Sequence, residues 1–142
     1  MKKLCKKRKA ISKEDFNQKV LSIYTEYFIA NDSYEDICSL FLQIDNKFLQ
    51  IRVNDAGIKC AYVNSFSTEE VYFDKEKNYG SIIRPLVVEW LNNVNLLEII
   101  KTEDDYNEDY KVTLQFENHH RIDYFYSYEK DRAFLVIDDK LL

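Results

Sequence analysis

Two runs of alternating residues in the C-terminal third constrain the fold more than any other feature of the sequence. An apolar or aromatic side chain stands at every second position of residues 110–116, and again of residues 122–128. Because successive side chains of a strand point to opposite faces, this period of two indicates two half-buried strands. Residues 118–120 between them predict a turn. A second turn at 129–132 then leads to a third strand at 134–137.

The middle of the chain carries a second group of predicted strands. Short runs of apolar residues alternate there with residues that favour turns, which is the pattern of a β-meander. The predicted strands are 40–44, 48–53, 58–63 and the short segment 70–73, with turns at 45–47 and 55–57. Residues 37–44 have two interpretations at their start, because Ser33 and Asp36 could also cap a short helix there.

Two other stretches have apolar residues at helical spacing and predict helices. In residues 16–28 the apolar positions are three or four apart, and Ser12 with Asp15 resembles a capping box in front of them. Residues 79–94 carry a broad apolar face, and Pro85 is tolerated if it lies in the first turn. Strands segregated from helices predict an α+β fold.

The predicted architecture therefore has two helices packed on one face of a curved, mostly antiparallel sheet, in the order helix, β-meander, helix, β-meander. A chain of 142 residues suits one domain of ordinary size. We expect residues 11–142 to form this single α+β domain. Residues 1–10 form a basic tail, which is expected to be disordered.

Charge is divided unevenly along the chain. Residues 1–9 carry six basic side chains and no acidic one, so the rest holds 14 basic and 25 acidic side chains, a net charge of −11. An acidic body repels nucleic acid and attracts a basic partner surface. Nucleic acid is therefore expected to bind only through the tail. The candidate residues for such binding are Lys2, Lys3, Lys6, Lys7, Arg8 and Lys9.

The most acidic segment lies between an apolar run and a clear strand, and it holds five carboxylates within eight residues. It is predicted to be an exposed recognition loop for a basic partner; a solvated connector is the alternative. Aromatic residues are also abundant, and exposed tyrosines are frequent contact residues at interfaces. The candidate partner-binding residues are Glu103, Asp104, Asp105, Tyr106, Glu108, Asp109, Tyr110, Tyr124, Tyr126 and Tyr128. For the last three, a core face is the alternative interpretation.

Several classes of site lack their signatures. Two glycines are too few for a phosphate-binding loop, and an EF-hand spacing is missing. The three cysteines have no CxxC spacing, and His119 and His120 are adjacent residues of a predicted turn. We therefore expect no cofactor and no metal site. No secretory signal or membrane span is recognisable, and a reducing, cytoplasmic location is expected.

These observations favour a small acidic protein that binds and inhibits another macromolecule, most simply a basic protein. Toxin-neutralising immunity proteins and phage-encoded inhibitors of host defence nucleases are similar in size and charge, although no motif carries the likeness. One alternative is a nucleic-acid-associated module that acts through the basic tail. Another is an enzyme with a carboxylate-based, metal-dependent site, for which Asp45 with Lys47 and Glu76 with Lys77 are the candidates.

Overall fold

The computed structural model describes residues 8–31, 33–65, 70–74, 76 and 78–142, and in this part of the chain it is an all-β protein. Of the described residues, 72% lie in two antiparallel sheets and none lies in an α-helix. The predicted α+β fold, with two helices on one face of a single sheet, is therefore wrong. The chain divides into two compact units, one containing most of the first sheet and the other most of the second.

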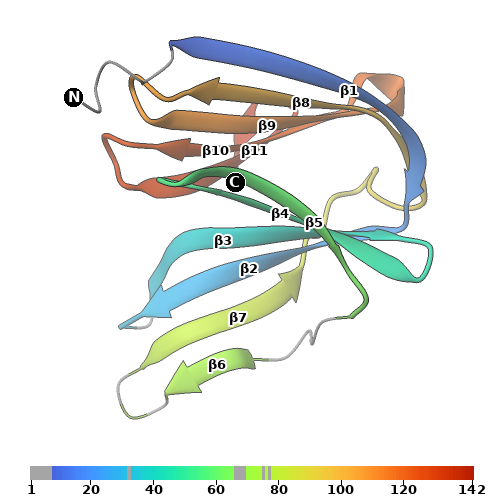
Figure 1. Ribbon diagram of the computed structural model, residues 1–142. Coiled ribbons are helices and arrows are strands. Elements are labelled where there is room, and N and C mark those ends of the chain that lie inside the picture. The colour runs from blue at the N-terminus through green and yellow to red at the C-terminus, as the bar shows by residue number, and fades with distance from the viewer. Residues whose placement is uncertain (1–7, 32, 66–69, 75, 77) are drawn as a thin grey trace. The chain divides into compact units, whose positions relative to one another are not determined.

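The first sheet, here called sheet A, is built mainly from the C-terminal part of the chain (Figure 1). Its strand order is β1 (Lys9–Val20), β8 (Val94–Asp104), β9 (Asp109–Phe116), β10 (Arg121–Ser127), β11 (Arg132–Ile137) and β12 (Lys140–Leu141). A short 3₁₀ turn, η2 (Glu117–His119), joins β9 to β10. The second sheet, sheet B, has the order β5 (Gly57–Val63), β4 (Lys47–Asn54), β3 (Ser33–Ile44), β2 (Ser22–Ala30), β7 (Tyr79–Pro85) and β6 (Glu70–Asp74).

The strands predicted from period-two patterns are confirmed. In sheet A, Tyr124 of β10 lies opposite Val112 of β9 on one side and Leu135 of β11 on the other. In sheet B, the hairpin around residues 45–46 pairs Leu42 with Leu49. The ambiguous residues 37–44 belong to β3, so the strand interpretation holds there. The short strand β6 is also present, whereas β8 and β12 were not predicted.

The first predicted helix is replaced by parts of β1 and β2. Strand β2 pairs with β3 on one side and β7 on the other, and these ladders satisfy its backbone groups. Both faces of β2 are partly buried, because Thr25 and Glu26 are adjacent and both below 9% exposed. A strand of this kind does not alternate strictly, so its apolar residues can imitate helical spacing. Its β-branched and aromatic residues favour the strand.

The second predicted helix is replaced by β7 and an irregular segment. Ile82 and Ile83 lie in β7 and are buried. Both are β-branched, and β-branched residues favour strands. Pro85 is the last residue of that strand instead of part of a first helical turn. Residues 86–93 contain turns but no helix, and Leu91 N–H donates to Val88 O at 3.0 Å within them.

One face of sheet A carries its largest buried side chains. Alternate residues of β9 and β10 are almost fully excluded from solvent, as the sequence pattern predicted. Burial of apolar area at roughly 25 cal/mol per Å² is the main term that stabilises such a face. These residues are Val112, Leu114, Phe116, Ile122, Tyr124 and Leu135. The turns at the ends of the strands hold the polar residues described next.

Candidate protein-binding site

Two hairpin turns of sheet A form an acidic surface, which we call the acidic tip. Residues 105–108 connect β8 to β9, and residues 128–131 connect β10 to β11. A hydrogen bond from the Tyr128 N–H to Asp109 Oδ1, 3.1 Å long, joins the two turns. The acidic tip consists of the carboxylates Asp104, Asp105, Glu108, Asp109, Glu129 and Asp131 and the tyrosines Tyr106 and Tyr128.

The β8–β9 turn is held by its own side chains. Asp104 Oδ1 accepts from the Asn107 N–H at 3.1 Å, and Asp104 Oδ2 accepts from Asn107 Nδ2 at 2.9 Å. The phenol of Tyr110 donates to Asp105 Oδ1 at 3.0 Å. Glu108 has φ 58°, in the left-handed region that tight turns require. The carboxylates of this turn are therefore fixed in position before any partner arrives.

The electrostatic effect of the acidic tip is visible at two buried tyrosines. Burial first, and then the hydrogen bond to Asp105 and the nearby carboxylates, raise the pKa of Tyr110 to about 12. The pKa of Tyr126 is raised above its usual range, chiefly by the hydrogen bond to Asp131 and then by burial. The charges of Asp55 and Glu108 raise it further. Carboxylates of three hairpin turns therefore raise the pKa of Tyr126. Asp131 lies in the β10–β11 turn, Glu108 in the β8–β9 turn and Asp55 in the β4–β5 turn.

Two tyrosines of the acidic tip are exposed. Tyr106 is 53% exposed and Tyr128 is 59% exposed. The guanidinium carbon of Arg8 lies 4.2 Å from the centroid of the Tyr106 ring, a cation–π distance. An exposed tyrosine beside carboxylates offers a basic partner both an aromatic face and a counter-charge.

The other candidate residues from the sequence are divided between surface and interior. Tyr110, Tyr124 and Tyr126 are 7%, 0% and 5% exposed, so they belong to the buried face and are not surface contacts. Glu103 is half-buried on β8, opposite Tyr110. For the basic tail, Lys9 is the first residue of β1, whereas Lys2, Lys3, Lys6 and Lys7 lie outside the described residues.

The residues of the enzymatic alternative do not form an assembled site in the described part of the chain. Asp45 and Lys47 are exposed at the β3–β4 turn. Glu76 is exposed after β6, and Lys77 lies outside the described residues. Among the described residues, no group of three or more His, Cys, Asp or Glu side chains is placed to hold a metal ion.

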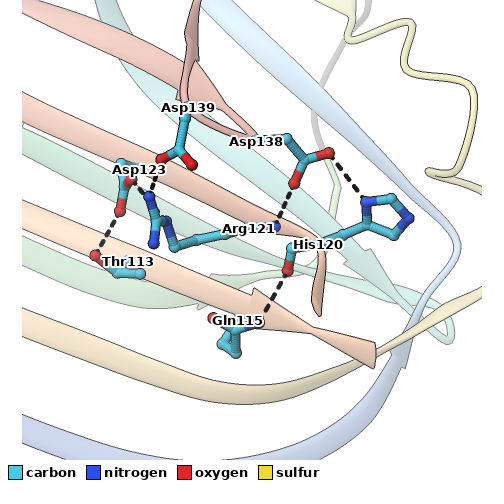
Figure 2. Close-up of polar contacts among 7 residues, drawn as sticks. All are labelled: Thr113, Gln115, His120, Arg121, Asp123, Asp138 and Asp139. Carbon is cyan, nitrogen blue, oxygen red and sulfur yellow. Dashed lines mark hydrogen bonds and ion pairs between the residues drawn. The ribbon is translucent and has the colours of Figure 1, made fainter. Parts of the chain in front are cut away.

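A second polar group lies at the other end of β9 and β10 and was not predicted (Figure 2). His120 Nδ1 lies 2.9 Å from Asp138 Oδ2, and Asp138 Oδ1 accepts from the Arg121 N–H at 2.8 Å. The Arg121 guanidinium pairs with Asp123 at 3.1 Å and also with Asp139. Asp138 and Asp139 form the β11–β12 turn, so this group fastens that turn to β10.

The arrangement of this second group supports a structural role. The Thr113 hydroxyl donates to Asp123 Oδ1 at 2.6 Å, which completes a row across β9 and β10. Gln115 Nε2 donates to the His120 carbonyl at 3.3 Å. Because the Thr113 hydroxyl is directed to a carboxylate and not to the imidazole, the group does not reproduce a nucleophile–base–carboxylate relay. The residues are up to 26 positions apart, so no local motif could have revealed them.

The comparisons with known proteins add no assignment. No protein-family model matches this chain, and no curated protein and no solved structure matches it either. In the described part of the chain, no helix is long and apolar enough to cross a membrane.

Proposed function

We propose that the protein binds a basic surface of another protein through the acidic tip, and that this binding inhibits or neutralises the partner. The observation that carries the proposal is the joining of two acidic turns by the hydrogen bond between Tyr128 and Asp109. It gathers carboxylates and two exposed tyrosines on one pre-organised surface. A rigid recognition surface loses less conformational entropy on binding than a mobile loop does.

The charge of the whole chain supports the same proposal. Residues 10–142 carry a net charge of −11, so their field attracts a basic protein over a distance of several ångströms. Electrostatic steering of this kind raises association rates by roughly 10- to 1,000-fold at low ionic strength. An inhibitor that must reach its target before damage occurs gains most from a fast encounter.

The test compares two variants that remove the same number of charges. The tip variant is Asp105→Asn, Glu108→Gln and Glu129→Gln, in which amide oxygens can still accept hydrogen bonds. The control variant is Glu14→Gln, Asp15→Asn and Glu89→Gln, at exposed positions outside the acidic tip. Each purified protein is used to capture partners from a lysate of the source organism at low and then moderate salt.

We expect the wild type and the control variant each to capture one basic protein in stoichiometric amount. The tip variant should not capture it. The association rate of that protein, measured afterwards with purified components, should fall with the tip variant and depend less on salt. Equal capture by all three proteins would remove the acidic tip from the binding surface. Capture of nucleic acid alone, lost when residues 2–9 are deleted, would favour the basic tail instead.

A further inference from the structure

A small pocket opens on sheet A near the acidic tip. It has a volume of about 320 Å³ and is formed by β1, β8, β9 and β10. Phe125 and Ser127 line it and alternate along β10 with the buried Tyr124 and Tyr126. The residues that line the pocket are Lys9, Thr102, Asp104, Asp109, Tyr110, Lys111, Phe125, Tyr126 and Ser127. The pocket therefore lies entirely within one compact unit.

The pocket contains charges of both signs, arranged in two rows. Asp104 and Asp109 lie opposite each other at the end of β8 and β9. Lys111 lies in the next row on the same face, opposite Thr102 on one side and Phe125 on the other. Two residues along a strand span roughly 6.6 Å, so the carboxylate row and the lysine row are separated by about this distance.

The lysines of the pocket have no counter-ion within the described residues. Neither the Lys9 nor the Lys111 side chain forms a hydrogen bond or ion pair there. Asp104 already accepts two hydrogen bonds from Asn107, whereas Asp109 uses only Oδ1, for the N–H of Tyr128. Asp109 Oδ2 and the two ammonium groups are therefore the groups that a ligand would find available.

The floor of the pocket is apolar and rigid. The Phe125 ring stacks on Phe134 of β11, with 5.4 Å between centroids and 26° between planes. Arg132 lies 4.9 Å from the centroid of the same Phe134 ring, which further restricts the pair. The hydroxyl-bearing residues Thr102 and Ser127 also line the pocket and can donate or accept hydrogen bonds.

We propose that this pocket binds a free α-amino acid with an apolar side chain. The ligand carboxylate faces Lys9 and Lys111, its ammonium group faces Asp109, and its side chain packs on Phe125. A volume of about 320 Å³ is at the lower end of the range of small-molecule sites, which suits a ligand of this size. The site is distinct from the protein contact proposed above, although it shares Asp104 and Asp109 with the acidic tip.

Ligands of a single charge sign fit the same pocket less well. A nucleotide would bring its phosphate close to Asp104 and Asp109, which repel it. An arginine or lysine side chain would meet two lysines that lack counter-ions. A zwitterion presents opposite charges to the two rows, so both rows attract it.

The experiment uses the full-length protein and ligands that differ in one charge. L-phenylalanine and L-leucine are titrated by calorimetry, followed by L-phenylalaninamide, which lacks the carboxylate, and 3-phenylpropionate, which lacks the ammonium group. The proposal expects binding of at least one of the two amino acids, and affinities at least about tenfold weaker for both analogues of phenylalanine. Failure of both amino acids to bind, or equal binding of 3-phenylpropionate, would overturn it.

Variants then locate the binding to this pocket. Lys111→Gln and Asp109→Asn are each expected to weaken amino-acid binding by about tenfold, since each removes one charge that faces the ligand. Asp109→Asn keeps a carbonyl oxygen for the Tyr128 N–H, so the turn should persist. Lys59→Gln, at an exposed lysine outside the pocket, is the matched control and should bind like the wild type. Unchanged affinity in both pocket variants would place the ligand elsewhere and refute the assignment.

Discussion

The phenol of Tyr126 donates a hydrogen bond to Asp131 Oδ1 at 2.6 Å and thereby ties the buried face of β10 to the β10–β11 turn. Tyr126 is only 5% exposed, whereas Asp131 is exposed. The tyrosine therefore reaches from the apolar interior to the surface, as an amphipathic side chain can. The same bond is the largest cause of the raised pKa of Tyr126.

Tyr126→Phe removes this hydrogen bond and keeps the ring that fills the core. We expect the free energy of unfolding to fall by about 1 kcal/mol, because water can replace the lost donor at the exposed Asp131. Urea denaturation at neutral pH measures the change. Tyr128→Phe, at a tyrosine that is 59% exposed, should change the stability much less. An equal loss of stability in both variants would show that the hydrogen bond to Asp131 makes no specific contribution to the free energy of unfolding.

Stability should also fall at alkaline pH, because the folded state keeps Tyr110 neutral. Its pKa is raised from 10.0 to about 12 by burial and by the bond to Asp105. The unfolded chain loses this proton near pH 10 and the folded protein near pH 12, so the stabilisation is complete below pH 10 and is lost between these values.

The variant Tyr110→Phe isolates this contribution. It has no phenol to ionise, so its stability should decline less than that of the wild type between pH 10 and pH 12. Urea midpoints at pH 9 and pH 11 give the comparison, and ultraviolet absorbance of phenolate follows the titration directly. Parallel declines in the two proteins would assign the alkaline instability to other groups, of which Tyr126 is the first to consider.

The strands that could be predicted are those that bury one face. In β9 and β10 every second residue is buried, so the pattern in the sequence and the pattern of burial coincide. In β2 the adjacent residues Thr25 and Glu26 are both buried, and strict alternation is lost. Intrinsic propensity and residue spacing do not distinguish helix from strand in such a segment. The strand conformation of β2 is determined by its pairing with β3 and β7.

The scarcity of glycine and proline also concealed turns. Positive φ angles in this chain occur mainly at asparagine and aspartate, whose short polar side chains tolerate the left-handed region. Asn31 has φ 53° and ends β2, and Asn93 has φ 54° just before β8. Asn17, with φ 49°, lies inside β1. Asn31 and Asn93 therefore mark turns at the ends of the two segments predicted as helices, and they do not divide either segment.

The candidate site was predictable only in part. The position of the acidic turn between β8 and β9 follows from composition, since a dense run of carboxylates cannot lie in a core. Its joining to the β10–β11 turn depends on the pairing of Tyr128 with Asp109, 19 residues apart. The contact of His120 with Asp138 is similarly non-local. Such contacts follow from strand order and register, which the sequence pattern does not determine.

Asp123 should be the most sensitive carboxylate of the second polar group. Its side chain is 13% exposed, and it accepts from the Thr113 hydroxyl at 2.6 Å and from Arg121 Nε at 3.1 Å. Asp123→Ala leaves the buried Thr113 hydroxyl without this acceptor. We therefore expect the free energy of unfolding to fall by roughly 1.5–3 kcal/mol. Thermal or urea unfolding measures it, with Asp139→Asn as the control because that carboxylate is 79% exposed. Equal stability of the two variants would show that the hydrogen bonds of Asp123 across β9 and β10 contribute little to the free energy of unfolding.

Cys38 should react slowly with alkylating reagents in the folded protein. Burial first, and then the negative charges of Glu26 and Asp36, raise its pKa from 9.0 to about 12. Because the thiolate is the nucleophile, a rise of three pKa units lowers the reactive fraction at pH 8 roughly 1,000-fold. Iodoacetamide labelling, followed by mass spectrometry of the peptide that contains Cys38, measures the rate in native buffer and in urea.

Glu26→Gln tests the cause of this low reactivity. It removes the negative charge that raises the pKa of Cys38 most, while keeping a side chain of similar size, so Cys38 labelling should become faster in the folded protein. The matched control is Glu89→Gln, an exposed carboxylate that does not contribute to the raised pKa of the thiol. Labelling of the native wild type as fast as in urea would contradict the prediction. A rate unchanged by Glu26→Gln would leave burial and the charge of Asp36 as the causes of the raised pKa.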